Sequence, residues 1–232
     1  MKKNILFIGG SYGIGLESAK LLASESNLFV ASRTKEDLSE IECTHLSFDA
    51  SKDDIKDLDL PDTIDGLVYF PGSINLKPFK MLSPQIFEDE MNLNFFSLVR
   101  VVHGLLPKLK KSDQASLVFF STVAAKVGMP FHTSIAASKS AIEGFAKSLA
   151  AEYAPSFRVN VIAPSLTNTK LSEKLLSNET KVEKMGERHP LKRVGEPQDI
   201  ANVVEFLLSD KSTWVTGQVL GIDGGLSTLN VN

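Results

Sequence analysis

Short apolar runs alternate with longer segments of helical periodicity along the chain. Turn residues bound each short run, and apolar residues recur every three or four positions in each longer segment. This pattern predicts seven parallel strands, at residues 4–8, 28–32, 44–48, 66–70, 116–120, 158–162 and 218–222. It predicts helices at residues 14–24, 84–111, 134–153 and 197–208, two of which begin with a proline suited to the first helical turn.

Strands that alternate with crossover helices indicate the α/β class. Because such crossovers are right-handed, the strands build a doubly wound sheet with helices on both faces, and the ligand crevice lies beyond the carboxyl ends of the strands. A chain of 232 residues suffices for one Rossmann-type domain, residues 1–232. Segment 167–189, rich in Lys, Glu and Ser, resembles an insert, and we expect it to form a substrate lid.

Composition and charge restrict the partners. Hydrophobic residues make up 43% of the chain and charged residues 23%, which is typical of a globular protein with a sizeable core. The 25 Lys and Arg against 28 Asp and Glu supply no basic field for nucleic acid or an anionic membrane. No apolar stretch approaches the length of a membrane span. We therefore expect a small-molecule substrate, with no nucleic acid and no membrane as partner.

Cysteine and histidine usage adds two expectations. The single cysteine, Cys43, cannot form an internal disulfide, which fits a reducing, cytoplasmic setting. The apolar run after Lys3 stops at Gly9, short of a secretory signal. No metal site is expected, because no ligand spacing relates the four histidines, His45, His103, His132 and His189.

The turn after the first strand carries the clearest ligand signal. Residues 9–15 read Gly-Gly-Ser-Tyr-Gly-Ile-Gly, and a helical pattern follows directly. Glycines at such a turn let the backbone approach a pyrophosphate, and the helix N-terminus offers free N–H groups and a positive dipole end. The alternative is an ordinary glycine-rich turn. The placement between strand and helix favours a nucleotide site made of Gly9, Ser11, Tyr12, Gly13, Ile14 and Gly15.

The spacing Gly-x-x-x-Gly-x-Gly resembles the opening motif of the short-chain dehydrogenases/reductases, with Ile8 where that family usually has threonine. The resemblance covers nearly the whole chain, including Thr-Gly-Gln at 216–218 and Asp-Gly-Gly at 223–225. It implies an oxidoreductase that transfers a hydride between a nicotinamide cofactor and a carbonyl or alcohol. Further cofactor contacts implied by the resemblance are the adenine-side Asp49 and Ala50, then Gly72, and the nicotinamide-side Pro164, Thr167 and Thr169.

The end of the second strand indicates which nucleotide binds. An acidic residue there usually bonds the ribose 2′-hydroxyl of NAD. This chain has Ser32 at that position, followed by Arg33. A guanidinium could clamp a 2′-phosphate, helped by the hydroxyl of Ser32 or Thr34, and this favours NADP(H) over NAD(H). The alternative is a solvated arginine at a strand end.

The resemblance also implies a catalytic set of Asn, Ser, Tyr and Lys, with tyrosine as general acid and base. Asn94 and Lys139 match the asparagine and the lysine. The tyrosine belongs four residues before the lysine, where this chain has Ile135. The serine belongs thirteen residues earlier, so a hydroxyl is kept at Thr122 or its neighbour Ser121.

Isoleucine cannot exchange a proton, and loss of a positioned general acid typically costs about 10² to 10⁴ in rate. His132 is the foremost substitute donor, ahead of Thr133, Ser134 and Tyr69. A second departure is Tyr-Phe-Pro-Gly at 69–72, where the family has Asn-Asn-Ala-Gly. Two hypotheses follow: an NADP(H)-dependent oxidoreductase with an atypical catalytic site, or a catalytically silent nucleotide-binding, scaffold or regulatory subunit.

Quaternary structure is expected by analogy alone. The helices predicted at 84–111 and 134–153 resemble those through which the family pairs subunits, and the segment 217–225 resembles a second interface, so we expect a homotetramer or homodimer. The single tryptophan, Trp214, is expected to pack under the C-terminal strand.

Overall fold

A seven-stranded parallel sheet forms the centre of the computed structural model, which describes residues 2–231. The strand order is β3-β2-β1-β4-β5-β6-β7, with the change of direction between β1 and β4. The strands are β1 (Lys3–Ile8), β2 (Ser26–Ser32), β3 (Thr44–Ser47), β4 (Gly66–Tyr69), β5 (Ala115–Phe120), β6 (Phe157–Pro164) and β7 (Val219–Ile222). The predicted α/β class and all seven predicted strands are confirmed, with bounds that differ by a few residues.

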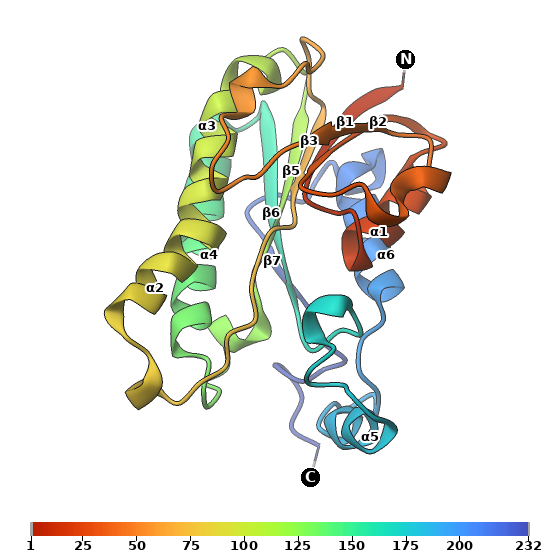
Figure 1. The fold of residues 1–232 in the computed structure, drawn as a ribbon. Helices are drawn as coiled ribbons and strands as arrows, with labels where there is room; N and C mark the ends of the chain where they lie inside the picture. Colours follow the sequence, from red (N-terminus) through yellow and green to blue (C-terminus); the bar gives the residue numbers. More distant parts are fainter. Residues whose placement is uncertain (1, 232) are drawn as a thin grey trace.

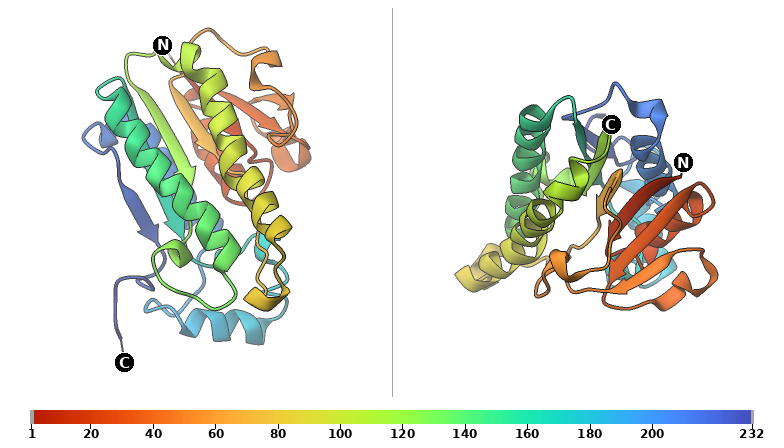
Figure 2. Two further views of the ribbon diagram at one scale, coloured as in Figure 1. Left: turned by 90° about the vertical axis from the view of Figure 1, so that its left-hand side faces the viewer. Right: turned by 90° about the horizontal axis from the view of Figure 1, so that it is seen from above.

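Helices cover both faces of the sheet. Figure 1 shows α3 and α4 on one face and α1 and α6 on the other, and Figure 2 shows α3 and α4 side by side across the strands. The helices are α1 (Gly13–Leu22), α2 (Pro84–Met91), α3 (Ser97–Leu109), α4 (Thr133–Tyr153), α5 (Glu179–Glu187) and α6 (Pro197–Leu208). None of the helices among the described residues combines the length and apolar character needed to cross a membrane.

Side chains on the two faces of the central strands pack into two separate apolar cores. Leu67 and Leu117 point into the core under α3 and α4, whereas their neighbours Val68 and Val118 point into the core under α1 and α6. Successive side chains of a strand alternate between faces, and both faces of this sheet are covered. This explains why the central strands are apolar at nearly every position.

The segment predicted as one helix at 84–111 is a helical run interrupted by a π-helical turn, Asn92–Phe96, between α2 and α3. Two side chains take carbonyl oxygens there: Asn94 Nδ2 donates to Glu90 O at 2.9 Å, and Ser97 Oγ donates to Asn92 O at 2.7 Å. Side-chain bonds of this kind compete with the regular backbone ladder. The turn places Asn94 in the interior, where it is fully buried.

Two further features depart from the sequence prediction. Helix α5 lies inside the expected lid, where no helix was predicted; its N-cap is Asn178, whose side chain accepts from Lys181 N at 2.9 Å. The prediction for Trp214 was wrong, because this side chain is 99% exposed. Its neighbour Val215 packs against the core instead, so the chain turns the indole outward.

Candidate active site

A cavity of about 530 Å³ lies beyond the carboxyl ends of the sheet strands. Its lining comes from the glycine-rich turn after β1, the ends of β2 and β5, the segment after β4, the first turns of α4, and the segment from 164 to 189. Every residue predicted to contact the cofactor lines this cavity: Gly9, Ser11, Tyr12, Gly13, Ile14, Gly15, Ser32, Arg33, Asp49, Ala50, Gly72, Lys139, Pro164, Thr167 and Thr169. Their contact with a nucleotide stays a prediction.

The glycine-rich turn folds back tightly on itself. A β-carbon at Gly15 would lie 2.1 Å from the α-carbon of Gly10, so no other residue fits there without a backbone shift. Gly13 has φ +58°, in the left-handed region, and a β-carbon on it would meet the Thr169 side chain at 3.3 Å. The turn therefore leaves bare backbone and the N-terminus of α1 facing the cavity, as a pyrophosphate site requires.

The end of β2 offers a cation beside hydroxyl groups. Arg33 is exposed, and its guanidinium makes no hydrogen bond with the residues that the structure describes. The Ser11 and Thr34 hydroxyls lie 3.4 Å apart, which joins the glycine-rich turn to this strand end. The Ser32 hydroxyl is directed elsewhere, since it donates to Thr34 O at 2.8 Å. The Ser32 hydroxyl, which was predicted to help bind a 2′-phosphate, is thus already hydrogen-bonded within the chain.

Asp49 follows β3 on the same side of the cavity. Its Oδ1 accepts from the Ser51 hydroxyl at 2.6 Å, and this bond, with the charges of Lys52 and Arg33, holds the pKa of Asp49 below its usual range despite partial burial. The carboxylate is therefore ionised at neutral pH and available to accept a hydrogen bond from an adenine amino group.

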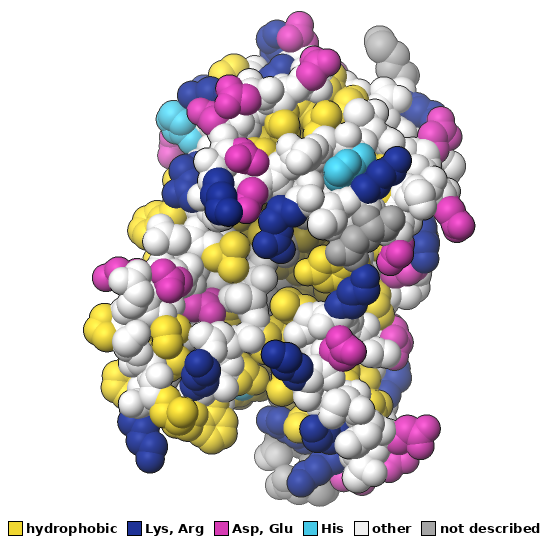
Figure 3. Space-filling view, viewed as in Figure 1, with side chains coloured by type: hydrophobic (Ala, Val, Ile, Leu, Met, Phe, Trp, Pro, Cys, Tyr) yellow, Lys and Arg dark blue, Asp and Glu magenta, His cyan; other side chains and the backbone are white. Residues whose placement is uncertain are grey.

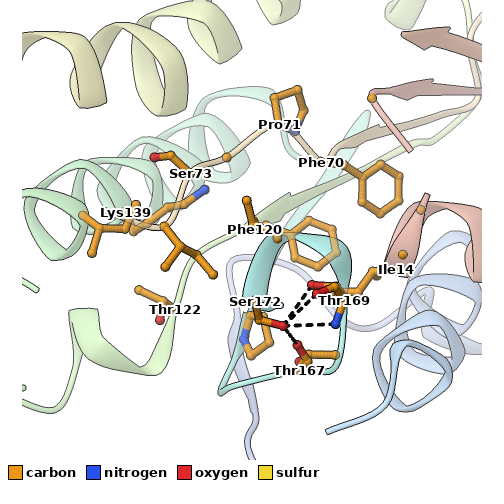
Figure 4. A pocket seen from close by; sticks show the side chains of 18 of the residues that line it. Ile14, Phe70, Pro71, Ser73, Phe120, Thr122, Lys139, Thr167, Thr169 and Ser172 are labelled. Atoms are coloured by element: carbon orange, nitrogen blue, oxygen red, sulfur yellow. Dashed lines mark hydrogen bonds between the residues drawn. The ribbon is translucent and has the colours of Figure 1, made fainter. Parts of the chain in front are cut away.

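The expected lid begins directly against the glycine-rich turn. Figure 4 shows Thr167, Thr169 and Ser172 gathered beside Ile14, and the Ser172 hydroxyl donates to Thr167 O at 2.5 Å. Lys170 Nζ lies 5.6 Å from the centre of the Tyr12 ring, which is within range of a cation–π interaction. The start of the segment 167–189 is thus in contact with the glycine-rich turn at residues 9–15.

The far end of the segment 167–189 is hydrogen-bonded to the residue that follows β6. His189 is buried, its Nδ1 bonds Met185 O at 2.9 Å, and its Nε2 lies 2.7 Å from the Ser165 hydroxyl. With Nδ1 donating to the carbonyl, Nε2 accepts from the serine. Ser165 and His189 both line the cavity, and neither was predicted as a site residue.

The opposite end of the cavity holds the predicted catalytic residues. Ile135 is 5% exposed and lines the cavity one helical turn before Lys139 on α4. Thr122, Ser121 and His132 also line it. In Figure 4 the Lys139 side chain extends from α4 toward the segment that carries Pro71 and Ser73, with Thr122 nearby. The residue one turn from the lysine therefore offers the cavity an apolar surface.

The two hydroxyls at the end of β5 differ in their surroundings. Ser121 is buried, and its Oγ donates to Glu143 Oε1 of α4 at 2.5 Å. Thr122 is half-buried, and its hydroxyl only accepts a long bond of 3.3 Å from Ala124 N. Thr122 is therefore the hydroxyl that can still donate to a ligand.

Lys139 is a buried cation without a hydrogen-bond partner among the described residues. The residue is 6% exposed, and its amine has no hydrogen-bond or ion-pair partner among the described residues. Burial lowers the pKa of Lys139 to about 8, and the negative charge of Glu90 opposes that shift. The amine is thus close to an even balance of its two protonation states at mildly alkaline pH.

Behind this lysine lies a polar cluster that sequence reasoning found only in part. Glu90 is 5% exposed, and its Oε2 accepts from Ser73 Oγ at 2.5 Å and from Asn94 Nδ2 at 2.8 Å. Asn94 Oδ1 has no partner among the described residues. A β-carbon at Gly72 would lie 3.3 Å from Lys139 Nζ and 3.4 Å from Asn94 Oδ1. Asn94 therefore lies behind the lining next to the lysine rather than in the lining itself.

The other proposed proton donors fare differently. Tyr69 is excluded, because it is 1% exposed, donates to Leu93 O at 3.1 Å in the core beneath α3, and has a pKa raised by burial. Thr133 and Ser134 do not line the cavity. His132 does line it, with Nδ1 held 2.7 Å from Pro130 O.

Apolar side chains surround the catalytic end. The outer lining there comes from the segment after β4, the π-helical turn, the loop before α4, the segment 167–189 and the chain after β7. It includes Ile74, Leu76, Leu93, Met129, Leu171, Leu175, Met185 and Leu226. Figure 3 shows a hollow with hydrophobic side chains inside it and lysine and arginine side chains around its rim. Residues 2–231 contain no cluster of three or more His, Cys, Asp or Glu able to hold a metal ion.

Comparison with known proteins places this geometry in a family. Residues 9–227 match the family model described as enoyl-(acyl carrier protein) reductase. The chain is similar to the 3-oxoacyl-[acyl-carrier-protein] reductase FabG of Chlamydia trachomatis, with 31% identity across 98% of both chains.

Solved structures share the fold. The ligand-free aldohexose dehydrogenase of Thermoplasma acidophilum has 26% identity and a TM-score of 0.88, and the match covers 100% of this chain and 97% of that one. ElxO with NADP bound has 24% identity and a TM-score of 0.87, covering 99% and 100%, a likeness of fold alone. Motifs, fold and relatives agree: the chain belongs to the short-chain dehydrogenase/reductase family of oxidoreductases.

Proposed function

We propose that the protein binds NADP(H) in the 530 Å³ cavity and transfers a hydride between its nicotinamide and a carbonyl or alcohol. The observation that carries the proposal is the joining, in one cavity, of the bare-backbone turn at 9–15 with the amine of Lys139. When bound, the cofactor supplies the hydride. The chain's own groups hold the pyrophosphate, the ribose and the adenine, and they position the substrate oxygen.

Two features support NADP(H) over NAD(H). No acidic side chain ends β2 to bond a ribose 2′-hydroxyl, and Arg33, whose guanidinium has no hydrogen bond to the described residues, follows β2 directly and lines the cavity. A guanidinium fork matches phosphate oxygens, and hydrogen bonds to ionised groups are the stronger kind. We expect NADPH to bind at least about tenfold more tightly than NADH. Equal affinities in calorimetry would contradict this assignment.

The substrate is expected to carry apolar groups next to its carbonyl. Ile135 faces the substrate end of the cavity together with the leucines and methionines of the lid and the loop before α4. Burial of each CH₂ group against such a surface contributes about 0.8 kcal/mol. A hydrophilic sugar would leave its hydroxyls unpaired there, which costs binding free energy. Ketones and quinones with hydrocarbon substituents are therefore the first compounds to test.

A catalytically silent, nucleotide-binding subunit is the second candidate. The observation that favours it is Ile135, which supplies no proton. In both cases the nucleotide binds, so turnover and not affinity separates the two functions.

The decisive experiment compares wild type, Ile135→Tyr and the matched control Ile135→Phe with NADPH and the panel of ketones and quinones. We expect wild type to oxidise NADPH in the presence of at least one apolar ketone. Turnover by the tyrosine variant alone would favour the silent subunit, and the phenylalanine control distinguishes the added hydroxyl from the added bulk. Failure of all three proteins to bind NADPH would contradict both functions.

A further inference from the structure

A polar cluster of Ser73, Glu90 and Asn94 lies next to Lys139 at the catalytic end of the cavity. Ser73 lines the cavity, and Glu90 and Asn94 lie directly behind it. Glu90 is a buried carboxylate that no predicted function of the chain uses. Its burial needs an explanation, because an unpaired charge in the interior is costly.

The hydrogen bonds of Glu90 account for part of its charge. Its Oε2 accepts from the Ser73 hydroxyl and from the Asn94 amide, at 2.5 and 2.8 Å. Neither donor is charged. Lys139 on the facing helix α4 is a cation whose pKa the Glu90 charge raises, and its Nζ lies 3.3 Å from the position of a β-carbon on Gly72, with Asn94 Oδ1 3.4 Å from the same point. The Glu90 charge therefore acts on Lys139 across the contact between α2 and α4.

Lys139 meets the geometric requirements of a proton donor. Its amine is buried, carries no hydrogen bond to the described residues, and reaches the cavity at the level of Gly72. In a site with tyrosine one turn earlier, a hydroxyl would stand between this amine and the substrate. Here Ile135 leaves the lysine as the nearest ionisable group on that face of α4, apart from His132 at the first turn.

We propose that Lys139 itself exchanges the proton with the substrate oxygen, and that Glu90 is the positioning residue that keeps the Lys139 amine charged. This inference rests on the proposed function. In the direction of reduction, the carbonyl carbon gains the hydride of NADPH and the C=O π pair moves to the oxygen. That oxygen forms an O–H bond as an N–H bond of the Lys139 ammonium breaks. The neutral amine then regains a proton from water that enters the cavity.

The protonation balance of Lys139 suits this role. Burial brings the pKa of its amine to about 8, so the group can give and regain a proton near neutral pH. Removal of the Glu90 charge would lower that pKa further, because an opposite charge nearby favours the charged amine. The two residues therefore predict a pH profile that depends on position 90.

The test uses Glu90→Gln, which keeps the acceptor for Ser73 but removes the charge, and Glu90→Asp, which keeps the charge. The matched control is Glu88→Gln, an exposed glutamate on the same helix. The titration of Lys139 is followed by carbon NMR of protein labelled at lysine Cε, with the resonance assigned by its loss in Lys139→Arg. NADPH affinity is measured by calorimetry, and reduction of the ketone used by wild type is measured from pH 6 to 10.

We expect the Lys139 titration and the midpoint of the reduction profile to coincide near pH 8 in wild type, in Glu88→Gln and in Glu90→Asp. In Glu90→Gln both should move down together by about one pH unit. At pH 8 the rate of reduction should then fall about fivefold, in step with the protonated fraction of the amine, while NADPH affinity stays within about twofold.

Several outcomes would overturn the inference. A pH midpoint of reduction that is the same in wild type and Glu90→Gln would show that another group donates the proton. A midpoint that differs from the Lys139 titration would show the same. Loss of turnover in His132→Asn with an unchanged Glu90→Gln profile would assign that role to the histidine. Wild type that binds NADPH but reduces nothing would overturn the proposed enzyme and the donor with it, whereas turnover with an uncoupled profile would overturn the donor alone.

Discussion

The nucleotide half and the catalytic half of the cavity differ in what builds them. The nucleotide half, around residues 9–15, consists mainly of backbone in a conformation that glycines permit, as the 2.1 Å approach at Gly15 shows. The catalytic half depends on side chains, and there Ile135 and Phe70 stand where the family resemblance implies tyrosine and asparagine. A binding turn made of backbone requires only that its residues be small. A site made of side chains, by contrast, can lose a catalytic group through a single substitution.

The catalytic half has kept a polar interior despite these changes. Phe70 packs against Phe7 and Phe120, with ring centres 5.0 and 5.2 Å apart, so this position now stabilises the core. The polar groups are instead found behind Ser73, where Glu90 accepts hydrogen bonds from Ser73 and Asn94. These polar groups lie next to α2 and the π-helical turn, a kind of distortion that is frequent at functional sites.

The largest effect is expected at Gly15. In Gly15→Ala the new β-carbon would lie 2.1 Å from Gly10 Cα, so the turn must open. Overpacking of this kind costs about 1–3 kcal/mol of unfolding free energy. NADPH binding should weaken about a hundredfold, equivalent to about 2.7 kcal/mol. Calorimetry with NADPH and urea unfolding measure the two effects.

The control is Gly128→Ala, because nothing lies within 4 Å of a β-carbon there. It should leave NADPH affinity within about twofold of wild type. If Gly15→Ala bound NADPH as well as this control, the nucleotide half would not depend on close backbone packing, and the contrast between the halves would fail.

A smaller effect is expected at Arg33. Removal of the guanidinium in Arg33→Ala should lower the affinity for NADPH about tenfold or more and leave the affinity for NADH nearly unchanged, because only NADPH carries the 2′-phosphate. The nearby exposed Lys35, replaced by Ala, controls for the loss of one positive charge in this region. Titration of both nucleotides into the three proteins makes the measurement. A parallel loss for NADPH and NADH would indicate that Arg33 acts on a shared part of the two molecules.

Much of the fold could be predicted because its signals are local. Each strand is an apolar run with turn residues on either side, and helix α6 begins and ends at the predicted residues, 197 and 208. Helix α5 was missed because it is polar on most sides and lacks an apolar stripe; its N-cap asparagine was the one available signal. The outward turn of Trp214 depends on the packing of its neighbour Val215, which no local pattern reveals.

Part of the candidate site could also be predicted from the sequence, and part could not. The predicted cofactor residues share one cavity because they follow strands of a single parallel sheet, and strand order alone brings those ends together. Glu90 was missed because the charge that it influences, on Lys139, lies on another helix, and a glutamate on a polar helix resembles a solvent-facing residue. Its spacing of four residues before Asn94 was the available signal.

The smallest effect is expected where the lid meets the nucleotide half. Lys170 Nζ lies 5.6 Å from the Tyr12 ring, and an exposed cation–π contact contributes about 0.5–1 kcal/mol. Lys170→Gln should therefore lower the affinity for NADPH about two- to fivefold and leave the pH midpoint of reduction unchanged. Lys174→Gln, an exposed lysine of the same segment, is the control and should match wild type. A shifted pH midpoint in Lys170→Gln would mean that the lid also sets the charge of the catalytic half, so that the two halves do not act separately.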